Sequence, residues 1–130
     1  MSKESTPKTV LVLEDDIDLR KFAAWMLESE GFQVIQEADG EAGLELLRQR
    51  QVDLLLLDIK LPSRDGWSIL EEMRNTPKLS TVPVIIFTAS ADISNRDRAL
   101  KMGAADYLIK PIGAEFLKES VKRIFLSSTQ

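Results

Sequence analysis

Short apolar runs alternate along the chain with segments whose apolar residues recur every three or four positions. The runs occupy 9–13, 52–57, 82–87 and 106–110, and a weaker one occupies 32–38. Continuous apolar runs of this length, rich in branched residues, are typical of strands that are buried on both faces. The sequence therefore predicts five strands.

The segments between the runs have the periodicity of helices. After the first run the apolar residues follow one helix face, and they are Leu19, Phe22, Ala23, Met26 and Leu27. Gly31 is placed to end this helix, and Asp39 is placed to cap a second helix through Arg50. The inner face of the second helix is predicted to be Ala42, Leu46 and Leu47.

Three more helices are predicted in the second half of the chain. Residues 66–74 form one, and Asp65 is placed to cap it. Ser94 or Asn95 is predicted to open the next, which runs to Met102 before Gly103. The last has an inner stripe of Leu117, Val121 and Ile124. Five alternations of strand and helix predict an α/β fold, a doubly wound parallel sheet with helices on both faces.

The composition of the chain excludes several classes of function. The chain has 130 residues, 44% of them apolar, which is the size of one domain. The net charge is −4 without a basic block, so direct binding to nucleic acid is not expected. No apolar stretch approaches the roughly 18 residues that span a bilayer, and the polar N-terminus is unlike a signal peptide. We therefore expect a cytoplasmic protein without membrane insertion.

The sequence contains neither cysteine nor histidine, which leaves carboxylates, hydroxyls and amines to carry any chemistry. These groups stand where strands end. The first strand is followed by Glu14, Asp15 and Asp16, the third by Asp58, the fourth by Thr88, and the fifth ends at Lys110. If the first and third strands are neighbours, Glu14, Asp15 and Asp58 converge and require a positive partner, because close like charges repel each other.

Magnesium is the simplest partner for such a cluster, since it prefers oxygen ligands and phosphate. Lys110 adds a fixed cation, Thr88 adds a hydroxyl, and Asp58 is the best candidate for a nucleophile. Any one of these residues taken alone has a structural explanation: an acid after a strand is more often a turn former or a helix cap. Their occurrence at the ends of four strands favours a shared site.

At these positions the sequence resembles the receiver domain of two-component response regulators. The resemblance rests on "VLVLEDD", "LLLLDIKLPSRDGW", "VPVIIFTAS" and "GAADYLIKPI" and covers about residues 8–126. It implies a single receiver domain over 1–130 with a flavodoxin-like sheet of order 2-1-3-4-5. It also implies a protein-interaction module that is controlled by phosphorylation, and not a turnover enzyme.

The resemblance assigns a role to each site residue. It implies that Asp58 is the phosphoacceptor and that Mg²⁺ is bound by Glu14, Asp15, Asp58 and the backbone carbonyl of Lys60. It implies that Thr88 and Lys110 bind the phosphoryl group and that the side chain of Tyr107 reports activation. Lys60 and Ser90 are implied to tune the phosphate lifetime. From the residues alone, the alternative for Tyr107 is a half-buried aromatic residue of an edge strand.

The implied phosphodonor is a phosphohistidine on a sensor histidine kinase or a histidine phosphotransfer protein. The implied output is a downstream protein partner, or a dimer of this chain, bound through the fourth helix, fifth strand and fifth helix. A Mg²⁺-dependent aspartyl-phosphate phosphohydrolase of the haloacid dehalogenase type is the alternative, but its second acid would stand where this chain has Lys60. A flavodoxin-like cofactor site is disfavoured, because acids occupy the first loop.

Overall fold

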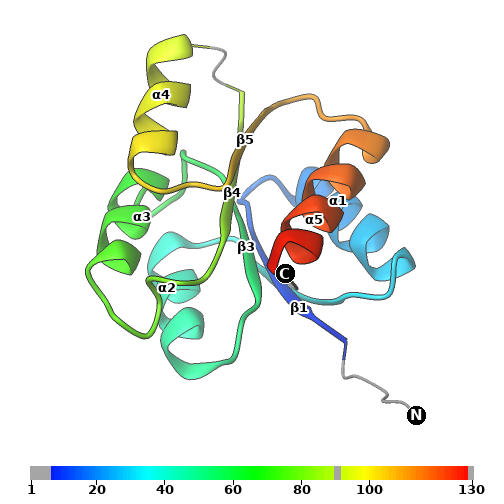
Figure 1. Cartoon of the computed structure of the whole chain (residues 1–130), viewed down its shortest axis with the longest axis horizontal. Coiled ribbons are helices and arrows are strands. Elements are labelled where there is room, and N and C mark those ends of the chain that lie inside the picture. Colours follow the sequence, from blue (N-terminus) through cyan, green and yellow to red (C-terminus); the bar gives the residue numbers. More distant parts are fainter. Residues whose placement is uncertain (1–6, 90–91, 129–130) are drawn as a thin grey trace.

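Five parallel strands form one sheet between two layers of helices (Figure 1). The computed structural model describes residues 7–89 and 92–128. The strands are β1 (Thr9–Leu13), β2 (Gln33–Glu37), β3 (Leu54–Leu57), β4 (Val84–Thr88) and β5 (Asp106–Ile109). Their order is β2-β1-β3-β4-β5, and every neighbouring pair is parallel. The predicted doubly wound sheet and its strand order are therefore confirmed.

The central strands are the longest apolar runs of the sequence because they are covered on both faces. All four leucines of β3 are fully buried, and so is nearly every residue of β1 and β4. The predicted bounds of two of them were wrong by up to two residues, since β3 begins at Leu54 and β4 runs from Val84 to Thr88. The edge strands β2 and β5 are only partly buried, which agrees with their more polar sequences.

The helices divide between the two faces of the sheet. They are α1 (Ile17–Ser29), α2 (Gly40–Gln49), α3 (Gly66–Arg74), α4 (Ile93–Lys101) and α5 (Ala114–Ser128). Figure 1 shows α1 and α5 on one side and α2, α3 and α4 on the other. The two apolar cores follow the same division, since Met26 and Val121 share one cluster and Leu44 and Leu70 share the other.

Aspartate side chains begin four of these helices. Asp39 and Asp65 accept hydrogen bonds from backbone N–H groups in the first turns of α2 and α3, as predicted. The prediction for α4 was wrong: the helix begins at Ile93, because Asp92 accepts a hydrogen bond from the backbone N–H of Ser94 at 2.9 Å. Asp16 caps α1 in the same way.

Some predicted inner faces also differ from the structure. Phe22 is 41% exposed and lies beside Trp25 on the outer side of α1, while Ala23, Met26 and Leu27 face the sheet. The periodicity placed Phe22 at the margin of the apolar stripe, where its ring lies beside Trp25 and is open to solvent. In α2, Ala42 and Leu46 are half-buried, and Leu44 with Leu47 forms the buried face. In α5, Leu117 and Val121 are buried as predicted, while Ile124 is only partly so.

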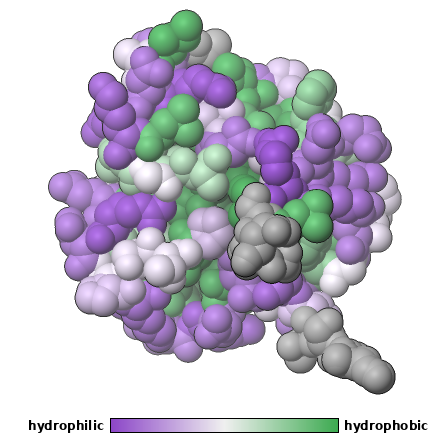
Figure 2. Space-filling view, viewed as in Figure 1, coloured by the Kyte–Doolittle hydropathy of each residue, from purple (hydrophilic) through white to green (hydrophobic). Residues whose placement is uncertain are grey.

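Polar side chains cover most of the face shown in Figure 2, and hydrophobic side chains interrupt them over α4 and in the middle of the molecule. Among the described helices, none combines the length and the apolar character needed to cross a bilayer.

Candidate functional site

The site is formed where β1 and β3 end side by side. Leu13 pairs with Leu57 in the sheet register, so the residues that follow each strand are also neighbours. The backbone N–H of Asp58 donates to the carbonyl of Leu13 at 3.1 Å, and that of Glu14 donates to the carbonyl of Glu37 at 3.0 Å. The sheet ladder therefore continues to the acids and fixes their backbone.

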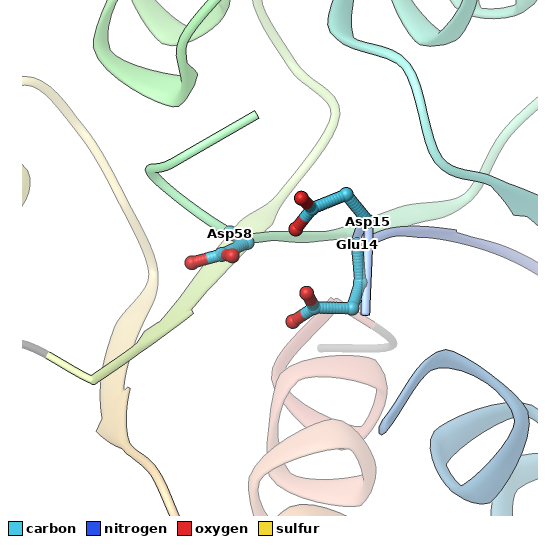
Figure 3. A group of neighbouring side chains, drawn as sticks. All are labelled: Glu14, Asp15 and Asp58. Atoms are coloured by element: carbon cyan, nitrogen blue, oxygen red, sulfur yellow. The ribbon is translucent and has the colours of Figure 1, made fainter. Parts of the chain in front are cut away.

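Three carboxylates converge at this point. One oxygen from each of Glu14, Asp15 and Asp58 lies within 4.8 Å of the other two. Figure 3 shows that the carboxylates of Glu14 and Asp15 come from the end of β1, that Asp58 follows β3, and that all three extend toward the same side. Glu14 and Asp58 are buried, whereas Asp15 is exposed. The predicted convergence of the acids is therefore present.

Burial raises the pKa of the Glu14 carboxyl above its ordinary value. The hydrogen bonds from Lys110 and from the backbone N–H of Asp16, at 2.9 Å, act in the opposite direction, and the charge of Asp58 adds to the rise. The Glu14 side chain is only 1% exposed, so water cannot solvate its charge. A cation at the cluster would favour the ionised form.

Lys110 supplies a positive charge to two of the three acids. Its ammonium group is hydrogen-bonded to a carboxylate oxygen of Glu14 and lies 3.3 Å from Oδ2 of Asp58. It also lies 4.9 Å from the ring centroid of Phe87. The backbone N–H of Lys110 donates to the carbonyl of Thr88 at 2.8 Å, and the Lys110–Pro111 peptide bond is cis. The ladder between β4 and β5 thus positions this lysine over the acids.

Local contacts orient Asp58. Its Oδ1 accepts a hydrogen bond from the backbone N–H of Ile59 at 2.8 Å. The other carboxylate oxygen, Oδ2, therefore faces the ammonium group of Lys110. The following loop is tied to α3, since the backbone N–H of Gly66 donates to the carbonyl of Ile59 at 2.7 Å. A Cβ at Gly66 would lie 2.5 Å from the carbonyl oxygen of Asp58, so glycine is required by this close approach.

A pocket of about 450 Å³ opens beside Asp58. Its lining includes Lys60, Thr88 and Lys110 in addition to Asp58, so four of the predicted site residues share it. Trp67 from α3 and Asn95 from α4 also line the pocket. Neither residue was predicted to belong to the site, because each stands in a helix some residues after β3 or β4 and not at the end of the strand.

The remaining predicted residues lie elsewhere. Tyr107 is 2% exposed in the apolar core, on β5 opposite Ile86 of β4, so the half-buried alternative was wrong. Asp16, the third acid after β1, is occupied as the cap of α1. Ser90 lies outside the described residues.

The donor set fits a magnesium ion. The cluster offers carboxylate oxygens, two buried and one exposed, which suits a small hard cation that keeps some of its water. It contains no sulfur or imidazole ligand, as the composition of the chain requires. Because one acid is exposed at the mouth of the cluster, a bound cation would remain accessible to a phosphate oxygen.

Residues 10–122 match the model of the response regulator receiver domain family. Among curated proteins, the chain is 35% identical over 121 residues to the response regulator ArlR of Staphylococcus saprophyticus. This alignment covers 93% of the chain and 54% of ArlR. The chain spans about half the length of the curated relatives it matches.

Solved structures show the same fold. The receiver domain of the Francisella response regulator 1452 is 30% identical, with a TM-score of 0.87, and the match covers 93% of this chain and 98% of that one. The receiver domain of the sensor histidine kinase PA1611 from Pseudomonas aeruginosa is 32% identical, with a TM-score of 0.82 and coverage of 90% and 96%. That structure has a magnesium ion coordinated in its active-site cleft.

Proposed function

This chain belongs to the response regulator receiver domain family, and from that membership we propose that Asp58 accepts a phosphoryl group in a two-component phosphorelay. The donor is a phosphohistidine on a sensor histidine kinase or a histidine phosphotransfer protein. An oxygen of Asp58 attacks phosphorus, the bond from phosphorus to the donor nitrogen breaks, and the imidazole leaves with the bonding electrons. We place this exchange in the cytoplasm.

The acids of the cluster hold the metal in this proposal. Glu14, Asp15 and Asp58, together with the backbone carbonyl of Lys60, would bind Mg²⁺, and the ion would neutralise the charge that develops on the phosphoryl oxygens. The Thr88 hydroxyl and the Lys110 ammonium bind the remaining oxygens, since both groups line the pocket beside Asp58. The proximity of the three carboxylates is the observation that carries the proposal.

Phosphorylation would switch a surface of the protein. The new group adds about 1.5 to 2 negative charges next to Thr88 and Lys110. Thr88 moves toward it, Tyr107 turns into the space that Thr88 leaves, and the surface of α4, β5 and α5 changes. To reverse a 1:99 ratio of active to inactive conformations, phosphorylation must favour the active conformation by about 5.5 kcal/mol. Several charge-assisted hydrogen bonds to the phosphoryl group would supply this preference. This surface then binds a downstream protein or a second copy of the chain.

Two positions tune the phosphate lifetime in this proposal. Lys60 is exposed at the rim of the pocket, two residues after Asp58, and Ser90 stands two residues after Thr88. The protein acts as a signalling module whose only chemistry is phosphoryl acceptance and hydrolysis. The phosphohydrolase alternative gains no support, because the position of its second acid is occupied by Lys60 and the family match is to receiver domains.

The direct test is intact mass spectrometry after incubation with acetyl phosphate and Mg²⁺. The protein is expected to gain the mass of one phosphoryl group, and the gain should disappear with EDTA or in Asp58→Asn. Asp53→Asn is the control, because Asp53 precedes the same strand but lies at its opposite end. A gain that survives Asp58→Asn, or no gain in the wild-type protein, would overturn the proposal.

A further inference from the structure

One wall of the phosphoacceptor pocket is held by a contact between two helices. The guanidinium carbon of Arg98 in α4 lies 4.1 Å from the ring centroid of Trp67 in α3, within the range of a cation–π interaction. Both Trp67 and Asn95, which is one turn before Arg98 on α4, line the pocket. The stack therefore joins the two helices at the edge of the pocket.

Trp67 is fixed relative to Asp58. It follows Gly66 directly, and Gly66 contacts the backbone of Asp58 and Ile59 too closely to allow a side chain. The ring also packs against the apolar core under α3. A side chain that packs on the Trp67 ring, as that of Arg98 does, is therefore held at a defined position relative to Asp58.

By contrast, α4 is attached to the rest of the domain by few buried side chains. All nine of its residues are described, and Ala99 alone among them is buried. At its carboxyl end Arg74 of α3 donates to the carbonyls of Met102 and Gly103, at 3.0 and 2.9 Å. That end is thus secured to α3. Nearer the pocket, α4 contacts the rest of the domain through Arg98, which lies over Trp67, and through Arg96, whose guanidinium donates to the carbonyl of Tyr107 at 3.4 Å.

We propose that Arg98 and Trp67 are positioning residues that hold the α4 wall against the phosphoacceptor pocket and thereby limit the access of water to the acyl phosphate on Asp58. The inference rests on the proposed function. In the hydrolysis step a water oxygen attacks phosphorus, the bond from phosphorus to the Asp58 oxygen breaks, and the carboxylate leaves with the bonding electrons. The proton of the water passes to the released phosphate or to solvent.

Loss of the stack should accelerate this hydrolysis. Arg98→Gln and Trp67→Leu are expected to raise the first-order rate of phosphate loss about two- to five-fold, which corresponds to a contact of about 0.5–1 kcal/mol. The double variant should be no faster than the single ones, because both remove the same contact. Arg98→Lys keeps a cation over the ring and should restore most of the lifetime. Lys101→Gln, which removes a charge from the same helix, is the matched control and should not change it.

Fluorescence separates positioning from general destabilisation. In a Trp25→Phe background Trp67 is the only tryptophan, because the chain has two. The fluorescence emission of Trp67 should change when beryllofluoride and Mg²⁺ are added. The Arg98→Gln substitution should shift the emission already before this addition. The thermal unfolding midpoint of Arg98→Gln should stay close to that of Lys101→Gln. Unchanged hydrolysis in both stack variants, or an equal acceleration in Lys101→Gln, would overturn the inference alone. A wild-type protein that takes no phosphoryl group would overturn the proposed function as well.

Discussion

Two adjacent aspartates at the end of β1 have different roles, although the sequence presents them as a pair. Asp15 faces the cluster with Glu14 and Asp58. Asp16 instead accepts hydrogen bonds from the backbone N–H groups of Asp18 and Leu19, at 3.0 and 3.1 Å. Neighbouring acids therefore serve two different structures, the carboxylate cluster and the first turn of α1.

This difference predicts how the two aspartates respond to the same substitution. Asp15→Asn should weaken Mg²⁺ binding by about tenfold or more, since it removes one charge from the cluster. Asp16→Asn should leave the affinity within about twofold, because asparagine caps helices as well as aspartate does. Isothermal titration with Mg²⁺ measures both. Equal losses in the two variants would show that the metal is attracted by general negative charge instead of the described cluster.

Lys110 balances two buried carboxylates, and its loss should therefore destabilise the fold. Removing one partner of a buried ion pair costs about 3–5 kcal/mol, and the lower end applies because the Lys110 side chain is 14% exposed. We expect Lys110→Met to lower the free energy of unfolding by about 3 kcal/mol without metal and by less with Mg²⁺.

Urea unfolding in EDTA and in Mg²⁺ measures this difference. Lys101→Met serves as the control, because Lys101 is exposed on α4. A loss of stability that is the same with and without Mg²⁺ would contradict the view that lysine and metal neutralise the same acids.

Among the elements, the junction between the loop after Asp58 and α3 leaves no room for an added side chain. A Cβ at Gly66 would lie 2.5 Å from the Asp58 carbonyl oxygen and 2.8 Å from the Cα of Ile59. Both neighbours are backbone, so they cannot give way without moving Asp58.

Gly66→Ala is therefore expected to lower the free energy of unfolding by about 1–3 kcal/mol and to slow phosphorylation by acetyl phosphate severalfold.

Gly31→Ala is the matched control. The φ of 96° at Gly31 makes alanine strained there, at a cost of about 1–2 kcal/mol in the free energy of unfolding, but nothing lies within 4 Å of the added carbon. It should lose stability while phosphorylation of the folded protein keeps its rate. Chemical denaturation and a phosphorylation time course distinguish the two; normal phosphorylation in Gly66→Ala would refute the coupling of α3 to the acceptor.

The agreement between predicted and observed bounds does not follow burial, since the completely buried strands β3 and β4 were predicted with errors of up to two residues. β1 and α3 have the predicted bounds, because an apolar run or a helix face flanked by acids and glycine leaves one register. The predicted start of α4 was wrong because Asp92, Ser94 and Asn95 are all residues that commonly cap helices, and the side chain that accepts from the first turn is that of Asp92. Phe22 was misplaced because periodicity gives the direction of a side chain but not the depth available under it.

At the scale of the molecule, the site was predictable because parallel strands bring their carboxyl ends to one edge. Once the order β2-β1-β3-β4-β5 is given, Asp58 must lie beside Glu14, and Thr88 and Lys110 must follow on the next strands. The wall formed by the helices was not predictable in this way. Trp67 and Asn95 enter the pocket through the packing of α3 and α4, and side-chain packing between helices leaves no period in the sequence.

We expect one divalent cation to bind among Glu14, Asp15 and Asp58. Mn²⁺ can locate this site, because it takes the same oxygen ligands as Mg²⁺ and broadens nearby NMR signals. In a titration of ¹⁵N-labelled protein, the backbone amides of 14–16 and 58–60 should lose intensity first, and excess Mg²⁺ should restore them. Signals of Gly31 and Gly103, each in the turn that follows a helix, should persist. Broadening centred instead on Glu30, Glu115 and Glu119, which line a pocket between α1 and α5 together with basic residues, would contradict this assignment.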